Sequence, residues 1–357
     1  MRDAIQASSG LLLVDKAAGM TSHDVVARVR RQLLRAHPGW DPRRRAVPSA
    51  GRARGRSGSR GKDLGKGSRP PRFKCGHAGT LDPMATGLLL VLVGKGSRLA
   101  PFLLGMDKTY LATLRLGVAT DTLDADGQIC ATAPLPAGPE ALLARLPEFT
   151  GDILQVPPAV SALKHEGTPL YKLVRQGRPL PELKARPVTI HRLEVTAVRW
   201  ETQEVDLRVD CGSGTYIRSL ARDLAQAAGT EGHLTALRRT RVGPFGVRDA
   251  LDGIMEQDGA AMAAALRPLA QALPHRPSLL LDMERAAFVR QGGQPDAGWL
   301  DGPWETPFQE GRAEGIFRMV DTEGNLVAVG RRETDPPGAR CVAVIPAAAE
   351  PSREQDP

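Results

Sequence analysis

The sequence predicts an α+β fold with a second, smaller β-rich domain at its C-terminal end. Strand-like and helix-like segments are mixed without a regular strand–helix–strand repeat, which argues against a doubly wound parallel sheet. After about residue 255 the composition changes to Ala, Pro and Gly, and short apolar strands follow. A chain of 357 residues is long enough for two domains. We therefore expect domains at 9–255 and 256–347, followed by a disordered tail at 348–357.

The first predicted elements are a strand, a capped helix and a polar insert. GLLLVDK (10–16) reads as a short buried strand. Thr21 can then cap a helix, because Asp24 follows three residues later and an apolar stripe recurs at every fourth position. From 36 to 73 this periodicity gives way to Pro, Gly, Ser and Arg. Such a segment cannot bury a core, so we expect a disordered basic insert.

The remaining elements follow from periodicity and from turn residues. Glycines at 212, 214 and 229 bound one helix, and Glu323-Gly324-Asn325 supplies a hairpin turn. The expected order after the insert is strand 88–94, short helix 97–104, strand 107–117, helix 139–149, strand–turn–helix 161–177, paired strands 186–200 and 204–214, helix 215–229, strand and helix within 278–292, hairpin 317–333, and strand 341–346.

The charge of the chain is concentrated in one block. The net charge is +8, but residues 28–74 hold sixteen Lys or Arg against Asp41 and Asp63, which gives +14 there and −6 elsewhere. A basic block beside a mildly acidic body indicates a polyanion partner, most simply nucleic acid. A merely solubilising insert is the alternative for this segment.

Several other classes of protein are disfavoured. No apolar run approaches the roughly 20 residues of a transmembrane helix, and no signal peptide is recognisable, so we expect a cytoplasmic protein. The four cysteines (75, 130, 211 and 341) form no CxxC pair. We therefore expect neither a zinc site nor a disulfide framework.

The stretch GHAGTLDPMATG (76–87) holds three glycines and a single acid, Asp82, directly before Pro83. Asp at an N-cap with Pro at the first helical position is a common start of a helix. The functional alternative is that the glycines let a flipped-out base come close, while Pro83 holds one carboxylate outward. The residues of this stretch alone leave both interpretations open.

The chain has only three tyrosines (Tyr110, Tyr171 and Tyr216), and each lies in a polar-flanked stretch. Core packing with a hydroxyl at the surface is the plain explanation for each. Arg218 follows Tyr216 two residues on, however, and LRRTR (237–241) adds three arginines. Arginine beside aromatic rings is how proteins hold phosphates and stack bases.

Five longer motifs follow one another along the chain: GLLLVDKAAGMTSHD, GHAGTLDPMATGLL, DKTYLATLRLGVATDTLDADGQI, PPAVSALKHEGTPLYKLVRQG and CGSGTYIRSLARDL. They cover about residues 9–250 and are interrupted only by the insert. In their order and approximate spacing they resemble the TruB family of tRNA pseudouridine synthases.

The resemblance implies an isomerase that converts uridine 55 in the T loop of tRNA to pseudouridine without a cofactor or metal. By position, Asp82 is the catalytic aspartate and Arg218 its basic partner. The residues that contact the uridine are then His77, Tyr110, Tyr216 and Leu237. Lys16 is left outside the site, as a residue that holds either the loop or a phosphate.

The implied fold is that of pseudouridine synthases, with a mixed, largely antiparallel sheet flanked by helices and a small PUA-like RNA-binding domain. Residues 161–177 resemble the RNA-clasping loop of the stand-alone enzymes, which implies a monomer that binds the T arm of tRNA without guide RNA.

A non-catalytic RNA-binding protein or tRNA-folding chaperone is the alternative. We favour the enzyme because Asp82, Tyr110 and Arg218 are all present. The carboxylate of Asp82 can act there as nucleophile, base or anion.

Overall fold

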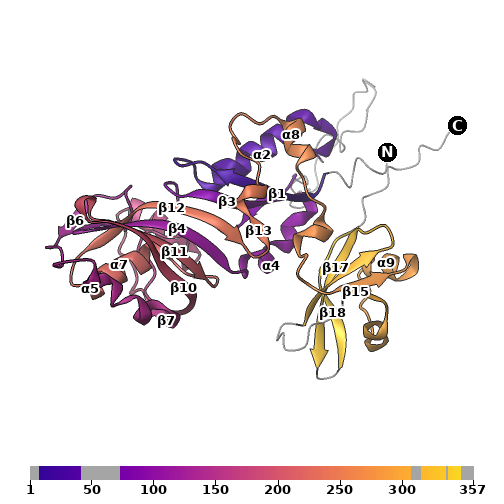
Figure 1. Ribbon diagram of the computed structural model, residues 1–357. Coiled ribbons are helices and arrows are strands. Elements are labelled where there is room, and N and C mark those ends of the chain that lie inside the picture. The colour runs from indigo at the N-terminus through magenta and orange to yellow at the C-terminus, as the bar shows by residue number, and fades with distance from the viewer. Residues whose placement is uncertain (1–7, 42–72, 307–314, 335–336, 347–357) are drawn as a thin grey trace, which may run out of the picture.

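The computed structural model describes residues 8–41, 73–306, 315–334 and 337–346, which form a large mixed sheet with flanking helices and a smaller sheet (Figure 1). Within these residues the large sheet has nine strands, with the order β1-β3-β12-β4-β11-β10-β7, β2 beside β3, and β13 beside β12. All its pairings are antiparallel except that of β12 with β3. The predicted α+β class is confirmed.

The elements of the large unit have the following bounds. Its main strands are β1 (Gly10–Lys16), β2 (Cys75–Ala78), β3 (Thr86–Val93), β4 (Lys108–Leu116), β7 (Gly151–Gln155), β10 (Arg186–Arg199), β11 (Glu204–Cys211), β12 (Gly232–Val242) and β13 (Phe245–Gly246). Two small hairpins add β5 (Val118–Thr120) with β6 (Ile129–Thr132), and β8 (Lys164–His165) with β9 (Thr168–Pro169). The helices are α2 (Ser22–Ala36), α4 (Ala100–Leu104), α5 (Glu140–Leu143), α6 (Leu170–Arg175), α7 (Ile217–Ala227) and α8 (Gly259–Ala264).

Strands β1 and β3 are covered on both faces, which explains why their sequences are continuously apolar. On one face, Leu12 and Val14 join an apolar cluster with α2 and α7. On the other face, Leu11 and Leu13 pack with α4 and with side chains of the small sheet such as Ile316. The β1 and β3 end of the large sheet is therefore the most deeply buried part of the fold.

The small sheet confirms the prediction of a β-rich C-terminal region. Its strand order is β15-β14-β16-β17-β18, and α9 packs against it (Figure 1). The bounds are β14 (Ser278–Leu281), α9 (Met283–Arg290), β15 (Trp304–Thr306), β16 (Ile316–Asp321), β17 (Leu326–Thr334) and β18 (Pro337–Val344). The sheet begins beyond the expected boundary at 255, because α8 still packs on α2 and Met262 joins the cluster of the large unit.

The expected helix over 139–149 is wrong. The chain forms α5 and then a separate 3₁₀ turn at Leu146–Phe149, with Pro147 at its start. Proline lacks the backbone N–H that a continuous helix would need at this point, so the helix is interrupted. The rest of the predicted order of strands and helices is found, with shifts at the element ends.

The expectation of disorder over 36–73 is wrong at both ends of that segment. Helix α2 continues to Ala36, and the His37 ring stacks on Trp40 with centroids 4.4 Å apart. Phe73 is buried, 6.0 Å from Trp40 between ring centroids. These three rings supply apolar surface that the polar average of the segment hides. Residues 42–72, like the tail at 348–357, lie outside the described residues.

Gly87 allows the parallel approach of β12 to β3. Its φ is +100°, and a Cβ there would lie 2.2 Å from the backbone oxygen of Arg239. We expect Gly87→Ala to lower the free energy of unfolding by about 2–4 kcal/mol, since the strained backbone and the clash both contribute. Urea unfolding measures this. Gly76→Ala is the matched control, because its added Cβ would meet nothing within 4 Å. Equal destabilisation by the two substitutions would contradict the argument.

Candidate active site

Asp82 lies in a tight turn that leads into β3. Ala85 N donates to Asp82 O at 3.1 Å, and the chain enters the strand at Thr86. Asp82 therefore does not begin a helix, and that interpretation of the Asp-Pro pair is wrong. The preceding residues of the motif form β2, in which His77 pairs with Val91. The carboxylate consequently projects from a short loop between two paired strands.

Two side chains from outside the motif hold this loop. The Ser22 hydroxyl accepts from Leu81 N at 2.8 Å and donates to Leu81 O at 3.1 Å. The Lys16 ammonium, fully buried, donates to Pro83 O at 3.1 Å and to Met20 O at 2.7 Å. Of the two roles left open for Lys16, the structure shows the one of holding the loop. Burial lowers the pKa of Lys16 to about 8.

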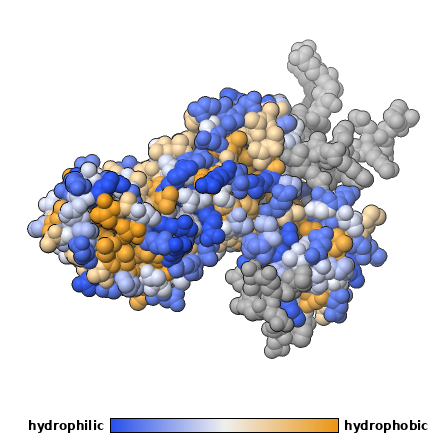
Figure 2. All heavy atoms as spheres, viewed as in Figure 1, coloured by the Kyte–Doolittle hydropathy of each residue, from blue (hydrophilic) through white to orange (hydrophobic). Residues whose placement is uncertain are grey.

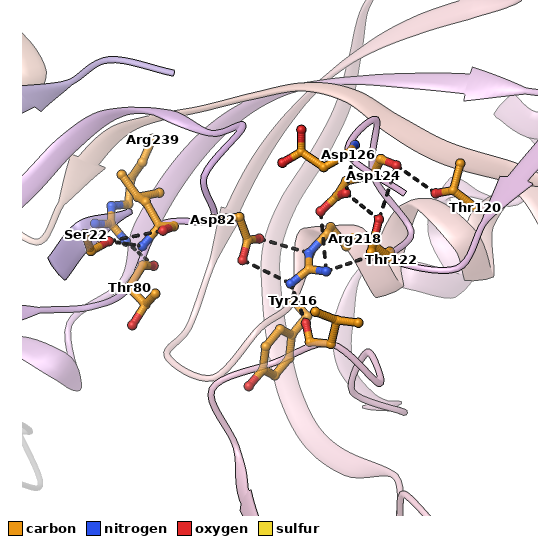
Figure 3. A network of polar contacts seen from close by, with 12 residues as sticks. Ser22, Thr80, Asp82, Thr120, Thr122, Asp124, Asp126, Tyr216, Arg218 and Arg239 are labelled. Atoms are coloured by element: carbon orange, nitrogen blue, oxygen red, sulfur yellow. Dashed lines mark hydrogen bonds and ion pairs between the residues drawn. The ribbon is translucent and has the colours of Figure 1, made fainter. Parts of the chain in front are cut away.

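Asp82 faces Arg218, as the resemblance implied (Figure 3). Arg218 Nε lies 2.9 Å from Asp82 Oδ2, and Nη2 donates to Oδ1 at 3.0 Å. Arg218 is itself fixed by donating to Thr122 O at 2.6 Å and to Val160 O at 2.9 Å. Its side chain is 5% exposed, whereas that of Asp82 is 31% exposed. The pair thus presents a rigidly held carboxylate at the surface of the loop.

Opposing effects act on the ionisation of Asp82. Burial raises the pKa of Asp82 above its ordinary value, the Arg218 guanidinium lowers it, and the negative charge of Asp124 raises it again. Asp124 Oδ2 lies 3.4 Å from Arg218 Nη1, so the two carboxylates share one guanidinium. Contact of Arg218 with both oxygens of Asp82 favours the ionised form of that carboxyl.

Three other expected site residues, Tyr216, Tyr110 and Leu237, come from elements outside the Asp82 loop. Tyr216 is the N-cap residue of α7, and its backbone N donates to Gln155 Oε1 at 2.8 Å. Tyr110 on β4 and Leu237 on β12 are both nearly buried and share one apolar cluster with Leu81. The charge of Asp82 acts on the hydroxyls of both tyrosines.

His77 is the most peripheral of the expected residues. It lies on β2, and the charge of Arg239 rather than that of Asp82 acts on its ring. Burial lowers the pKa of His77, which favours the neutral imidazole. Its Nδ1 is buried and has no hydrogen-bond partner within the described residues. A neutral ring of this kind can contact a ligand but is a poor proton donor.

Sequence reasoning missed Asp124, Thr122 and Arg239 as parts of the site. Asp124 lies in DTLDADG, whose Asp-Gly pair is typical of a simple turn. Thr122 contributes a backbone oxygen, which no side-chain pattern can reveal. Arg239 stands in the arginine run LRRTR, which was expected to hold phosphates or stack on bases, yet it is 1% exposed. The many arginines close to a tyrosine in sequence were the available signal.

The described part of the chain offers no group of three or more His, Cys, Asp or Glu side chains that could hold a metal ion. None of its helices is both long and apolar enough to cross a membrane.

Figure 2 shows hydrophilic side chains gathered over the middle of the large sheet, beside an apolar patch near α5 and β7. Leu143 on α5 and Leu154 on β7 are exposed.

Comparisons with known proteins identify the family of the chain. Residues 68–217 match the model of the TruB family pseudouridylate synthase N-terminal domain, and residues 218–274 match that of the tRNA pseudouridylate synthase B C-terminal domain. The tRNA pseudouridine synthase B of Arthrobacter sp. (strain FB24) is 41% identical, over 83% of this chain and 88% of the relative. That of Rhodococcus jostii (strain RHA1) is 40% identical, over 91% and 92%.

Solved structures show the same fold at lower identity. A Cbf5-Nop10-Gar1 complex contains a chain with a TM-score of 0.64 and 23% identity, covering 96% of this chain and 87% of that one. The archaeal box H/ACA sRNP Nop10-Cbf5 complex gives 0.63 and 21%, with 97% and 89% covered. These structures share the fold of the chain. The two family models and the relatives at about 40% identity show that the chain belongs to the TruB family of pseudouridylate synthases.

Proposed function

We propose that the chain isomerises uridine 55 in the T loop of tRNA to pseudouridine, with the Asp82 carboxylate acting on a flipped-out nucleotide. The ion pair between Asp82 and Arg218 carries this proposal, since it holds a partly exposed carboxylate in a loop of a TruB-family fold. Relatives that are about 40% identical over most of the chain bear the name tRNA pseudouridine synthase B.

The isomerisation needs no other reactant. The bond from C1′ to N1 breaks with its electrons on the base, the base turns, and C5 bonds to C1′. The proton on C5 then leaves, its bonding pair restores the C5–C6 double bond, and N1 gains a proton. The sugar carbon becomes electron-poor as in glycosidases, so a carboxylate nearby can stabilise or trap it. Asp82 is the carboxylate in position to do so.

The remaining assignments extend the same proposal. His77, Tyr110, Tyr216 and Leu237 contact the flipped uridine, and residues 161–177, which include β8, β9 and α6, clasp the T arm. The small sheet serves as a PUA-like RNA-binding domain, within the division at 9–255 and 256–347. The enzyme acts in the cytoplasm, as a monomer and without guide RNA.

Incubation of the protein with unmodified tRNA tests the function directly. Mapping of pseudouridine in the product should place the modification at position 55. A tRNA whose uridine 55 is replaced by cytidine is the control and should gain no pseudouridine. Binding of tRNA without any pseudouridine formation would instead support the alternative of a tRNA-folding chaperone and would refute the enzyme.

The pH dependence of activity should follow the ionisation of Asp82. Because its pKa is raised, activity should fall as the pH drops through a value above the ordinary one of 3.8. Asp124→Asn removes a negative neighbour and lowers the pKa of Asp82, so the acid limb of kcat/KM for the remaining activity should move to lower pH. Profiles of both proteins between about pH 4.5 and 8 measure this shift. If the acid limb of Asp124→Asn lies at the same pH as that of the wild type, or at a higher pH, the coupling between Asp124 and Asp82 is wrong.

Deletion of residues 42–72 should change the salt dependence of tRNA binding more than catalysis. The segment carries eleven Lys or Arg and one Asp, and the contacts among His37, Trp40 and Phe73 keep its ends together. Joining 41 to 73 by a short Gly-Ser linker should therefore flatten the slope of log K against log salt, because fewer counterions are released. Pseudouridine formation at saturating tRNA should remain unchanged. Loss of that activity would make the segment part of the active site.

A further inference from the structure

Arg239 on β12 is a buried cation that the chemistry described above does not use. Its side chain is 1% exposed, and it is the largest side chain buried to this degree in the described residues. Within those residues no carboxylate lies within ion-pair distance of its guanidinium. The positive charge acts instead on neighbouring cations, and it contributes to lowering the pKa of both Lys16 and Lys108 to about 8. Burying a charge without an ion-pair partner costs free energy of folding, so we expect Arg239 to have a function that offsets this cost.

The guanidinium braces the loop that carries Asp82. Arg239 Nε donates to Leu88 O at 2.7 Å, Nη2 to Gly79 O at 3.2 Å, and Nη1 to Thr80 O at 3.4 Å. Figure 3 shows Arg239 beside Thr80 on one side of Asp82, with Arg218 on the other. The loop is thus fixed between two arginines, of which only Arg218 touches the carboxylate.

The Arg239 side chain lies beside that of Tyr110. The two are paired residues of neighbouring strands β12 and β4, so their side chains project from the same face of the sheet. Burial raises the pKa of Tyr110, and the nearby positive charge of Arg239 lowers it in part. Arg239 therefore favours the anionic form of the Tyr110 hydroxyl.

We propose that Arg239 is a positioning residue for the isomerisation, which acts through Tyr110 by holding a positive charge beside that side chain and beside the Asp82 loop. The proposal rests on the proposed function, in which Tyr110 takes part in removal of the C5 proton. One buried cation, Arg239, then lies beside both the loop of Asp82, which acts on the sugar, and the phenol of Tyr110, which acts on the base. Tyr110 would touch the substrate, whereas Arg239 would not.

A double-mutant cycle separates this role from simple support of the loop. Single-turnover pseudouridine formation is measured for Arg239→Gln and Arg239→Lys, each with Tyr110 and with Tyr110→Phe. Arg239→Gln should lose roughly 10- to 100-fold with Tyr110 present but about threefold or less with Tyr110→Phe, because neighbouring residues on paired strands couple energetically. Arg239→Lys keeps the charge and should lose less. Arg238→Gln is the matched control, since Arg238 pairs with Asp15 on the half-exposed side of β12, and its effect should be the same in both backgrounds.

Each outcome decides the proposal. An equal loss with and without the Tyr110 hydroxyl would mean that Arg239 only braces the loop, and would overturn it. If melting curves show that Arg239→Gln does not fold, Arg239→Lys decides alone. The loss of activity caused by Arg239→Lys must then be larger with Tyr110 than with Tyr110→Phe. An equal loss in the two backgrounds, or no loss in either, overturns the proposal. Tyr110→Phe at the wild-type rate also overturns it but leaves the proposed function intact, whereas a wild-type protein that makes no pseudouridine refutes both.

Discussion

Asp82→Asn is expected to abolish pseudouridine formation while tRNA affinity changes little. The substitution keeps the size of the side chain and removes the charge that faces Arg218 at 2.9 and 3.0 Å. An amide can neither attack nor stabilise an electron-poor sugar carbon as a carboxylate can. Affinity should persist, because phosphate contacts and stacking dominate the binding of nucleic acids.

The measurement is single-turnover product formation beside tRNA affinity, with melting curves to verify the fold. Arg218 keeps its contacts with Thr122, Val160 and Asp124 in the variant, so the site should remain assembled. Asp126→Asn is the matched control, because Asp126 shares the loop of Asp124 but forms no ion pair within the described residues. Turnover by Asp82→Asn at a substantial fraction of the wild-type rate would eliminate the carboxylate mechanism.

Tyr110→Phe is expected to slow turnover by roughly 10²–10⁴-fold, the usual contribution of general acid–base catalysis. The ring and its packing beside Leu81 and Leu237 are kept, and only the hydroxyl next to Arg239 is lost. The uridine should still be bound and flipped. If the hydroxyl or its anion helps to remove the C5 proton, the sugar can be attacked but the product cannot be completed.

Affinity and single-turnover rates for Tyr110→Phe and Tyr110→Ala decide between two roles of this residue. Full activity of the Phe variant beside an inactive Ala variant would make Tyr110 a stacking platform, and the proton would then leave by another route. Tyr171→Phe compares the loss of a phenol in the proposed clasp at 161–177, where Tyr171 lies on α6 with Arg175 over its ring, 5.7 Å from the centroid. Its turnover at saturating tRNA should match the wild type, because the clasp binds tRNA but does not touch the reacting atoms.

The sequence alone predicted much of the local structure and the family. The Thr21–Asp24 capping box, the strand at 10–16 and the β-rich C-terminal region were all predicted correctly, because each depends on residues close together in the chain. The glycine-rich stretch around Asp82 and the ordered motifs identified the family. The wrong helix at 139–149 also has a local cause, since Pro147 interrupts it.

Only the tertiary structure decided what surrounds Asp82. Arg218 is 136 positions away in the chain, Asp124 reaches Arg218 from another segment, and Lys16 reaches the Asp82 loop from a third. The arginine run at 238–241 is typical of a solvated face, yet Arg238 pairs with Asp15 at the surface while Arg239 is buried under the loop. That difference arises because β12 lies between β3 and β4, so that alternate side chains meet either solvent or the backbone oxygens of Gly79 and Leu88. Arg238 and Arg239 therefore lie in opposite environments although they are neighbours of the same type. The order of the strands sets these environments, and no local sequence pattern predicts that order.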